Sequence, residues 1–151
     1  MLTLLEFKMT KTIMYLIDTN VISELRKKAK ANSGVKVFFK QASREKAALF
    51  LSVITLGELR RGVDSIRYRG DASQANQLAV WLDTLLSEYE SSILDFTTTE
   101  ALIWGHLRVP HPHNALDKQI AATALTYDLT LVTRNVKDFT GLGVELINPF
   151  S

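Results

Sequence analysis

Short, mainly apolar runs recur along the chain, separated by segments with helical periodicity. The runs lie at residues 13–17, 48–54, 92–96, 130–133 and 144–147. A continuous apolar run is typical of a strand buried on both faces, whereas a half-exposed strand alternates apolar and polar residues. The pattern therefore predicts a mostly parallel sheet of about five strands, covered on both faces.

Amphipathic helices are predicted between these strands. The clearest covers residues 71–89, where one apolar stripe contains Leu78, Trp81, Leu82, Leu85, Leu86 and Tyr89. Two further helices are predicted to begin near Val21 and after a break at Gly34. Thr55 is predicted to cap another helix, and a capping box of Thr97 and Glu100 precedes one that begins at Ala101. A last helix is predicted to begin at Asp117. This alternation of strand and helix indicates an α/β fold, a single-domain three-layer α/β/α sandwich.

The length of 151 residues fits one domain, which we place at residues 13–151 behind a loose extension at 1–12. Translation could start at Met1 or at Met14, which precedes the first convincing strand. The chain has no cysteine, which excludes disulfides and thiolate metal sites and fits the reducing cytoplasm where we expect the protein. No apolar run approaches the roughly 20 residues of a membrane span, so we expect no membrane association.

Charge alone does not identify a partner. The 18 basic and 16 acidic residues leave a net charge of +2, far from the strong positive charge of many nucleic-acid-binding domains. Basic residues gather at 26–30, at 60–61 and at 67–69. Each of these groups, taken alone, is more simply interpreted as a solvated helix face.

Acidic and polar residues follow several of the predicted strands. Asp18 comes directly after the first strand, and Glu58 lies one turn into the helix after the second. Thr133, Asn135 and Asp138 follow the fourth. Ligands of open α/β sheets bind at the carboxyl ends of the strands, so these residues are predicted to meet there.

Asp117 opens the helix that leads into the fourth strand. We expect the loop at 110–116, which contains two prolines, to bring this residue round to the same edge of the sheet.

Each acid alone could be a helix cap or a first-turn residue, with Asn20 competing with Asp18 for one of the caps. A cluster of carboxylates is harder to explain in this way, because neighbouring carboxylates raise one another's pKa unless a cation lies among them. Oxygen ligands of this kind suit Mg²⁺ or Mn²⁺ rather than zinc. The sequence therefore indicates a candidate acidic metal site.

The motifs around these acids resemble those of PIN-domain proteins, most closely the VapC- and FitB-like toxins. Four of them occur in the family's order: LIDTNVISE at 16–24, SVITLGELRRG at 52–62, LDKQIAATA at 116–124 and LVTRNVKDF at 131–139. With the closing Asn148-Pro149-Phe150 they span nearly everything after Met14, so the resemblance covers the whole predicted domain.

This resemblance implies a magnesium-dependent endoribonuclease that forms a homodimer. It also implies a type II toxin–antitoxin pair, in which a small cognate antitoxin covers or enters the acidic cleft. The antitoxin usually binds the operon's DNA, so contact of the toxin with DNA is expected only through the antitoxin.

The same resemblance assigns roles to individual residues. Asp18, Glu58 and Asp117 would be the core metal ligands, and Asn135 occupies a position where many relatives have an acid. Asp138, one helical turn later, is the alternative fourth residue. Thr19, Asn20 and Thr133 would support the ligands.

The expected chemistry is metal-assisted hydrolysis of RNA. A water oriented by a carboxylate attacks phosphorus in line, while the metal offsets negative charge on the phosphodiester. Basic residues at the rim would contact RNA phosphates; the candidates are Arg60, Arg61 and Arg134.

Three other interpretations remain open at this stage. His106, His111 and His113 could bind zinc, although a proline-containing loop without a nearby acid is a poor preformed site. Asp18 could form an aspartyl-phosphate in a phosphatase, although such enzymes usually have a second acid two residues on, where this chain has Asn20. A catalytically weak PIN-like module that only binds RNA or protein is supported by Asn135 alone.

Overall fold

The computed structural model describes residues 12–151, so the proposed extension at 1–12 lies outside the described residues except for Thr12. Within this range the five strands form one parallel sheet in the order β3-β2-β1-β4-β5. The strands are β1 (Met14–Ile17), β2 (Ala48–Ser52), β3 (Ile93–Leu94), β4 (Thr130–Val132) and β5 (Leu146–Ile147). The predicted five-stranded sheet is confirmed, and every pairing in it is parallel.

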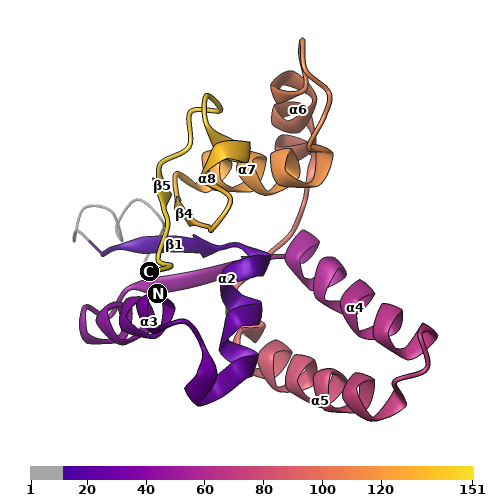
Figure 1. The fold of residues 1–151 in the computed structure, drawn as a ribbon. Helices are drawn as coiled ribbons and strands as arrows, with labels where there is room; N and C mark the ends of the chain where they lie inside the picture. The colour runs from indigo at the N-terminus through magenta and orange to yellow at the C-terminus, as the bar shows by residue number, and fades with distance from the viewer. Residues whose placement is uncertain (1–11) are drawn as a thin grey trace.

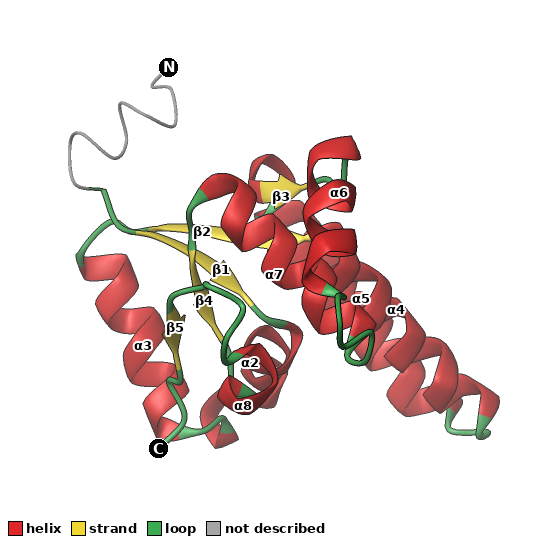
Figure 2. Ribbon diagram, turned by 90° about the horizontal axis from the view of Figure 1, so that it is seen from above, coloured by secondary structure: helices red, strands yellow, loops and turns green. Residues whose placement is uncertain are grey.

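Seven α-helices of the described chain cover the two faces of this sheet. On one side lie α2 (Thr19–Glu24), α3 (Ser33–Arg44), α4 (Val53–Tyr68) and α5 (Ala72–Glu88); on the other lie α6 (Thr98–Leu107), α7 (Ala115–Tyr127) and α8 (Val136–Phe139) (Figure 1). Two 3₁₀ turns, Leu25–Lys30 and Glu90–Ser92, complete the elements. The arrangement is the three-layer sandwich that the alternating pattern predicts, with α4 and α5 forming a hairpin that extends from the body (Figures 1 and 2).

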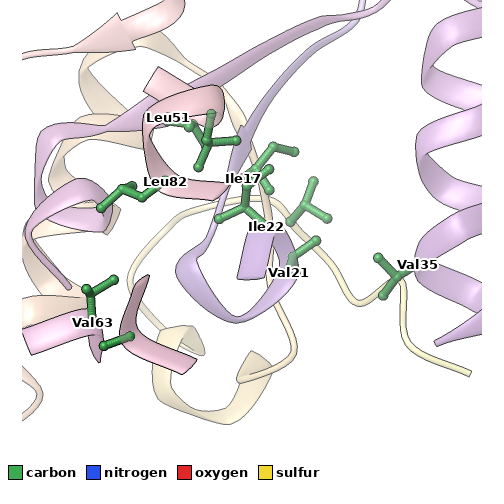
Figure 3. Packing of buried hydrophobic residues seen from close by; sticks show 10 residues of the cluster. Ile17, Val21, Ile22, Val35, Leu51, Val63 and Leu82 are labelled. Carbon is green, nitrogen blue, oxygen red and sulfur yellow. The ribbon is translucent and has the colours of Figure 1, made fainter. Parts of the chain in front are cut away.

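Neighbouring strand residues enter different cores, because successive side chains of a strand point to opposite faces. Ile17 and Val132 belong to the core under α2–α5, together with Leu51, Val35 and Leu82 (Figure 3). Leu16 and Leu131 belong to the core under α7 and α8. The sheet is thus buried on both faces, which explains its continuous apolar runs.

Several helices begin earlier than the sequence predicts. Ser52, rather than Thr55, caps α4, since its hydroxyl accepts a hydrogen bond from the Ile54 amide (3.0 Å). α2 begins at Thr19 with Asp18 as its cap, and α7 begins at Ala115, two residues before Asp117. Apolar residues continue across these junctions, so periodicity does not mark where the strand ends.

Two further expectations about individual residues need correction. Gly34 does not break the chain but lies in the first turn of α3, which Asn32 caps. Asp117 needs no long loop to reach the carboxyl edge of the sheet. α7 ends at Tyr127, three positions before β4 begins at Thr130, so its last turn lies near the amino end of β4. The first turn of α7, which contains Asp117, therefore lies at the carboxyl edge of the sheet.

The last residues of the chain pack beside α3 (Figures 1 and 2). The Ser151 amide donates a hydrogen bond to Asn32 Oδ1 (3.1 Å), and the Asn32 side-chain amide donates to the Ser151 carbonyl (3.1 Å). In residues 12–151, no helix has the length and apolar character needed to cross a membrane.

Candidate functional site

Asp18 lies between the carboxyl ends of β1 and β4, where the strand order switches from β2 and β3 on one side to β4 and β5 on the other. Its amide donates to the Val132 carbonyl (2.9 Å), which continues the β1–β4 pairing by one residue. The residue is only 3% exposed. The end of β1 therefore places a carboxylate at the bottom of this crevice.

The Asp18 carboxylate is held by three donors. Oδ1 accepts a hydrogen bond from the Thr19 amide (2.8 Å), and Oδ2 accepts from the hydroxyl of Thr133 (2.7 Å) and the side-chain amide of Asn20 (3.2 Å). Burial raises the pKa of Asp18, and the charge of Asp138 raises it further, while these three donors lower it. The net pKa is raised, which indicates an environment that favours a nearby cation.

Glu58 reaches the same crevice from the second turn of α4. The Thr19 hydroxyl donates a hydrogen bond to Glu58 Oε1 (2.8 Å) and lies 3.1 Å from the hydroxyl of Thr55. Burial raises the pKa of Glu58, the Thr19 hydrogen bond lowers it, and the charge of Asp18 raises it. Thr19 thus joins the start of α2 to α4 and orients Glu58.

Thr55 is a residue whose place in the site the sequence analysis missed. It is fully buried in the first turn of α4, and its hydroxyl contacts Thr19. The signal in the sequence is a hydroxyl residue one helical turn before Glu58. The interpretation of Thr55 as a helix cap does not predict that it contacts the site.

Asp117 has the most strongly perturbed pKa among the acids of the site. Its pKa is raised to about 6, first by burial and then by the charges of Asp18, Asp138 and Glu58. No hydrogen bond within the described residues offsets this effect. We refer below to these four residues as the acidic cluster.

Asn135 and Asp138 occupy different places at the end of β4. The Asn135 amide donates to the Thr133 hydroxyl (3.0 Å), but the Asn135 side chain makes no hydrogen bond within the described residues. Asp138 is exposed on α8, and its charge raises the pKa of both Asp18 and Asp117. Of these two residues, Asp138 is the one whose charge acts on the other acids of the cluster.

The three candidate RNA-contacting arginines have different surroundings. Arg61 acts on the cluster, since its charge lowers the pKa of Glu58. Arg60 pairs with Asp64 on the surface of α4 (3.1 Å), and the Arg134 guanidinium lies 4.8 Å from the centre of the Phe150 ring. The Arg134 amide donates to Asn20 Oδ1 (3.0 Å), which fixes the Asn20 side chain. Contact of these arginines with RNA stays a prediction.

Two cavities flank the cluster. A mostly apolar one of about 240 Å³ lies between α2, α4 and α5 and is lined by Thr19, Glu58, Leu59, Val63, Leu78 and Trp81 among others. A larger, polar one of about 660 Å³ lies beside Asp138 and contains all three histidines of the chain. The cluster therefore has an apolar neighbour on the Glu58 side and a polar one on the Asp138 side.

The acidic cluster fits a hard divalent cation in charge and in donor type, because all its donors are carboxylate oxygens. In residues 12–151, however, no three Asp, Glu or His side chains converge closely enough to form a complete ligand group. Both oxygens of Asp18 already accept hydrogen bonds, whereas Asp117 and Asp138 accept none from the described residues. The pKa values of Asp18, Glu58 and Asp117 are raised first by burial and then by neighbouring carboxylates, and a cation would offset both effects.

Comparison with known proteins places this geometry in a family. The family model for the PIN domain matches residues 15–142. The chain is 33% identical to the Toxin FitB of Neisseria gonorrhoeae, over 91% of this chain and 99% of that protein. It is 30% identical to the VapC ribonuclease Y4jK of Sinorhizobium fredii, over 91% of this chain and 98% of that protein.

A solved structure agrees with these relatives. The crystal structure of FitAcB from Neisseria gonorrhoeae contains a chain that superposes with a TM-score of 0.78 at 32% identity, over 90% of this chain and 98% of that one. Since the family model spans most of the chain and the relatives align over almost their full length, the chain belongs to the PIN-domain family and is of the VapC/FitB type.

Proposed function

We propose that this protein is a magnesium-dependent endoribonuclease and the toxin of a type II toxin–antitoxin pair. The observation that carries the proposal is the acidic cluster, in which carboxylates from the β1–α2 junction, α4, α7 and α8 come together at the carboxyl edge of the sheet and their charges contribute to the raised pKa of Asp18, Glu58 and Asp117. The names of the similar proteins, a toxin and a VapC ribonuclease, support this activity over other uses of such a cluster.

In this proposal Asp18, Glu58 and Asp117 hold the metal, with Asp138 or Asn135 as a fourth residue. Mg²⁺ is the expected ion and Mn²⁺ the alternative. When bound, the ion would supply Lewis-acid stabilisation of the negative charge that develops on the phosphodiester.

The chain's own residues then have distinct tasks. Thr133 and Asn20 hold the Asp18 carboxylate, and Thr19 holds that of Glu58, so the ligands are oriented before the substrate arrives. A carboxylate oxygen not engaged by these donors accepts a hydrogen bond from the attacking water and directs it toward phosphorus. Arg61, close enough to influence Glu58, is the arginine best placed to contact an RNA phosphate.

We further propose two protein partners. A cognate antitoxin would cover the acidic cluster, and the toxin would form a homodimer, as the resemblance to VapC- and FitB-like toxins implies. Contact with DNA would occur only through the antitoxin.

The decisive experiment is cleavage of a mixed RNA pool by purified, antitoxin-free protein, with magnesium and with EDTA. We expect discrete cuts that require magnesium and that fall at least about 100-fold in Asp117→Asn, because loss of a metal ligand exceeds the 10–100-fold loss typical of a supporting residue. Asp83→Asn is the matched control, since Asp83 is an exposed aspartate on α5. Absence of cleavage in protein shown to be folded would favour a binding-only module, and hydrolysis of phosphomonoesters without RNA cleavage would favour the aspartyl-phosphate route.

A further inference from the structure

The polar cavity beside Asp138 is lined mainly by residues that the catalytic proposal does not use, although Asp138 itself belongs to both. The end of α6, the loop at residues 109–114, the start of α7, and α8 with the turn after it form its walls. Its ionisable side chains are His106, His111, His113, Lys118, Lys137 and Asp138. The volume of about 660 Å³ falls in the range of pockets that bind small molecules.

The chemistry of this cavity suits an anion. Its two lysines and three histidines are hydrogen-bond donors, and its single acid is the one that it shares with the acidic cluster. The sequence contains only three histidines, and all of them line this cavity.

Lys118 gives the strongest indication of a negatively charged ligand. The residue is only 4% exposed, and its ammonium group donates a hydrogen bond to the His111 carbonyl. No acid among the described residues forms an ion pair with it. Because a buried charge is costly unless an opposite charge compensates it, an anion bound in the cavity would stabilise the Lys118 ammonium.

Several contacts within the protein hold the loop that forms the cavity. Besides the Lys118 contact, Arg108 Nε donates to the Pro112 carbonyl (3.3 Å), and its guanidinium stacks on the Trp104 ring at 4.7 Å. The Trp104 indole donates in turn to the Ala115 carbonyl (2.9 Å). A preorganised loop reduces the entropy lost when a ligand binds.

From these observations we infer that the cavity is a subsite for a phosphate of the RNA strand, next to the phosphate that is cleaved. Asp138 lines the cavity and also belongs to the acidic cluster, so a strand crossing the cluster places an adjacent phosphate within reach of Lys118, Lys137 and the histidines. This inference rests on the proposed ribonuclease function, which supplies the RNA.

The histidines provide a direct test by NMR. A five-nucleotide single-stranded RNA is titrated into the protein in EDTA, which prevents cleavage, while the imidazole proton signals of the three histidines are followed. We expect saturable shifts of these signals, and an affinity about tenfold weaker in Lys137→Ala. Lys40→Ala, which removes an exposed lysine on α3, is the matched control and should leave the affinity unchanged.

The possible results separate this inference from the proposed function. Histidine signals that stay fixed while the same protein cuts RNA in magnesium would overturn the subsite but not the nuclease. Histidine shifts without cleavage would support the subsite and count against the nuclease. Shifts with inorganic phosphate but not with RNA, or equal losses in the Lys137 and Lys40 variants, would also overturn the subsite.

Discussion

At the scale of single residues, Asp117 is the acid whose pKa is raised by all three other members of the acidic cluster. Its pKa of about 6 lies above the ordinary aspartate value of 3.8. A raised pKa in the folded state means that the contribution of this group to stability is complete below the unfolded value and is lost as the pH rises through about 6. In metal-free protein the charged Asp117 therefore destabilises the fold at neutral pH.

Replacing this charge should stabilise the metal-free protein while abolishing activity. We expect Asp117→Asn to raise the free energy of unfolding in EDTA by about 1 kcal/mol at pH 8, since partial exposure screens the full effect. The difference should shrink as the pH falls from about 6 to about 4. Urea unfolding at both pH values measures it, and the Asp83→Asn control should show no change. Equal stability of wild type and Asp117→Asn at pH 8 would contradict the destabilisation of charged Asp117 by burial and by the neighbouring carboxylates.

Thr19 tests whether hydroxyl groups position the ligands. Thr19→Val keeps the shape of the side chain but removes the hydroxyl that donates to Glu58. We expect about tenfold slower RNA cleavage in a folded protein, as for other residues that orient a metal ligand. Because this hydrogen bond lowers the pKa of Glu58, its loss should also move the acid limb of the pH–rate profile to higher pH. Thr19→Ser should restore both properties; failure of serine to do so would indicate a packing role.

Sequence reasoning located these residues but not their environments. The rule that ligands bind at the carboxyl ends of parallel strands brought Asp18, Glu58 and Asp138 to one edge, as the structure has them. It could not show that Asp18 is buried while Asp138 is exposed, because burial depends on how α2 and α8 pack. The pairing of Arg60 with Asp64 follows from their spacing of four residues on one helix.

At the scale of elements, the junctions between strand and helix escaped prediction. β2 ends at Ser52 and α4 begins at the next residue, so an apolar run continues through both elements. Hydrogen bonding by the Ser52 and Asp18 side chains, rather than a change in hydrophobicity, ends each strand and starts the helix. Those short junctions direct Asp18 and Glu58 into the crevice.

Gly34, in the first turn of α3, allows the backbone at the end of the chain to pack closely against this helix. A Cβ added at Gly34 would overlap the Pro149 carbonyl and lie 2.8 Å from the Ser151 amide. Gly34→Ala should therefore displace the end of the chain and lower the free energy of unfolding by about 1–3 kcal/mol. Gly105→Ala on α6, where a Cβ meets nothing, should instead stabilise by up to about 1 kcal/mol. Thermal unfolding of the two variants measures both effects, and two similar shifts would contradict the packing argument.

At the scale of the whole molecule, the sheet brings residues from distant parts of the sequence to one edge. Asp18 and Asp117 come from segments about a hundred positions apart, yet the charge of the first raises the pKa of the second. The parallel sheet could be predicted because its strands are continuous apolar runs. The strand order, which places β1 beside β4 and opens the crevice between them, could not, since hydrophobicity does not encode which strands are neighbours.

If the acidic cluster binds magnesium, the stability that the metal adds to the fold should depend on pH, because the ligands must be deprotonated to bind it. An ion that binds only the folded chain stabilises it, by about 1.4–2.7 kcal/mol when its concentration is 10–100 times the dissociation constant. For a domain of this size that corresponds to a rise in Tm of roughly 5 °C at pH 8.

Lowering the pH through about 6 protonates Asp117 and removes a ligand, so the magnesium-dependent rise in Tm should diminish by pH 5. Asp117→Asn should show a small rise at either pH, and NaCl at matched ionic strength should not reproduce the effect in wild type. Because the metal-free variant is expected to be the more stable protein at pH 8, magnesium should narrow the gap in Tm between variant and wild type. A rise of equal size in both proteins would mean that magnesium stabilises the fold from somewhere other than the acidic cluster.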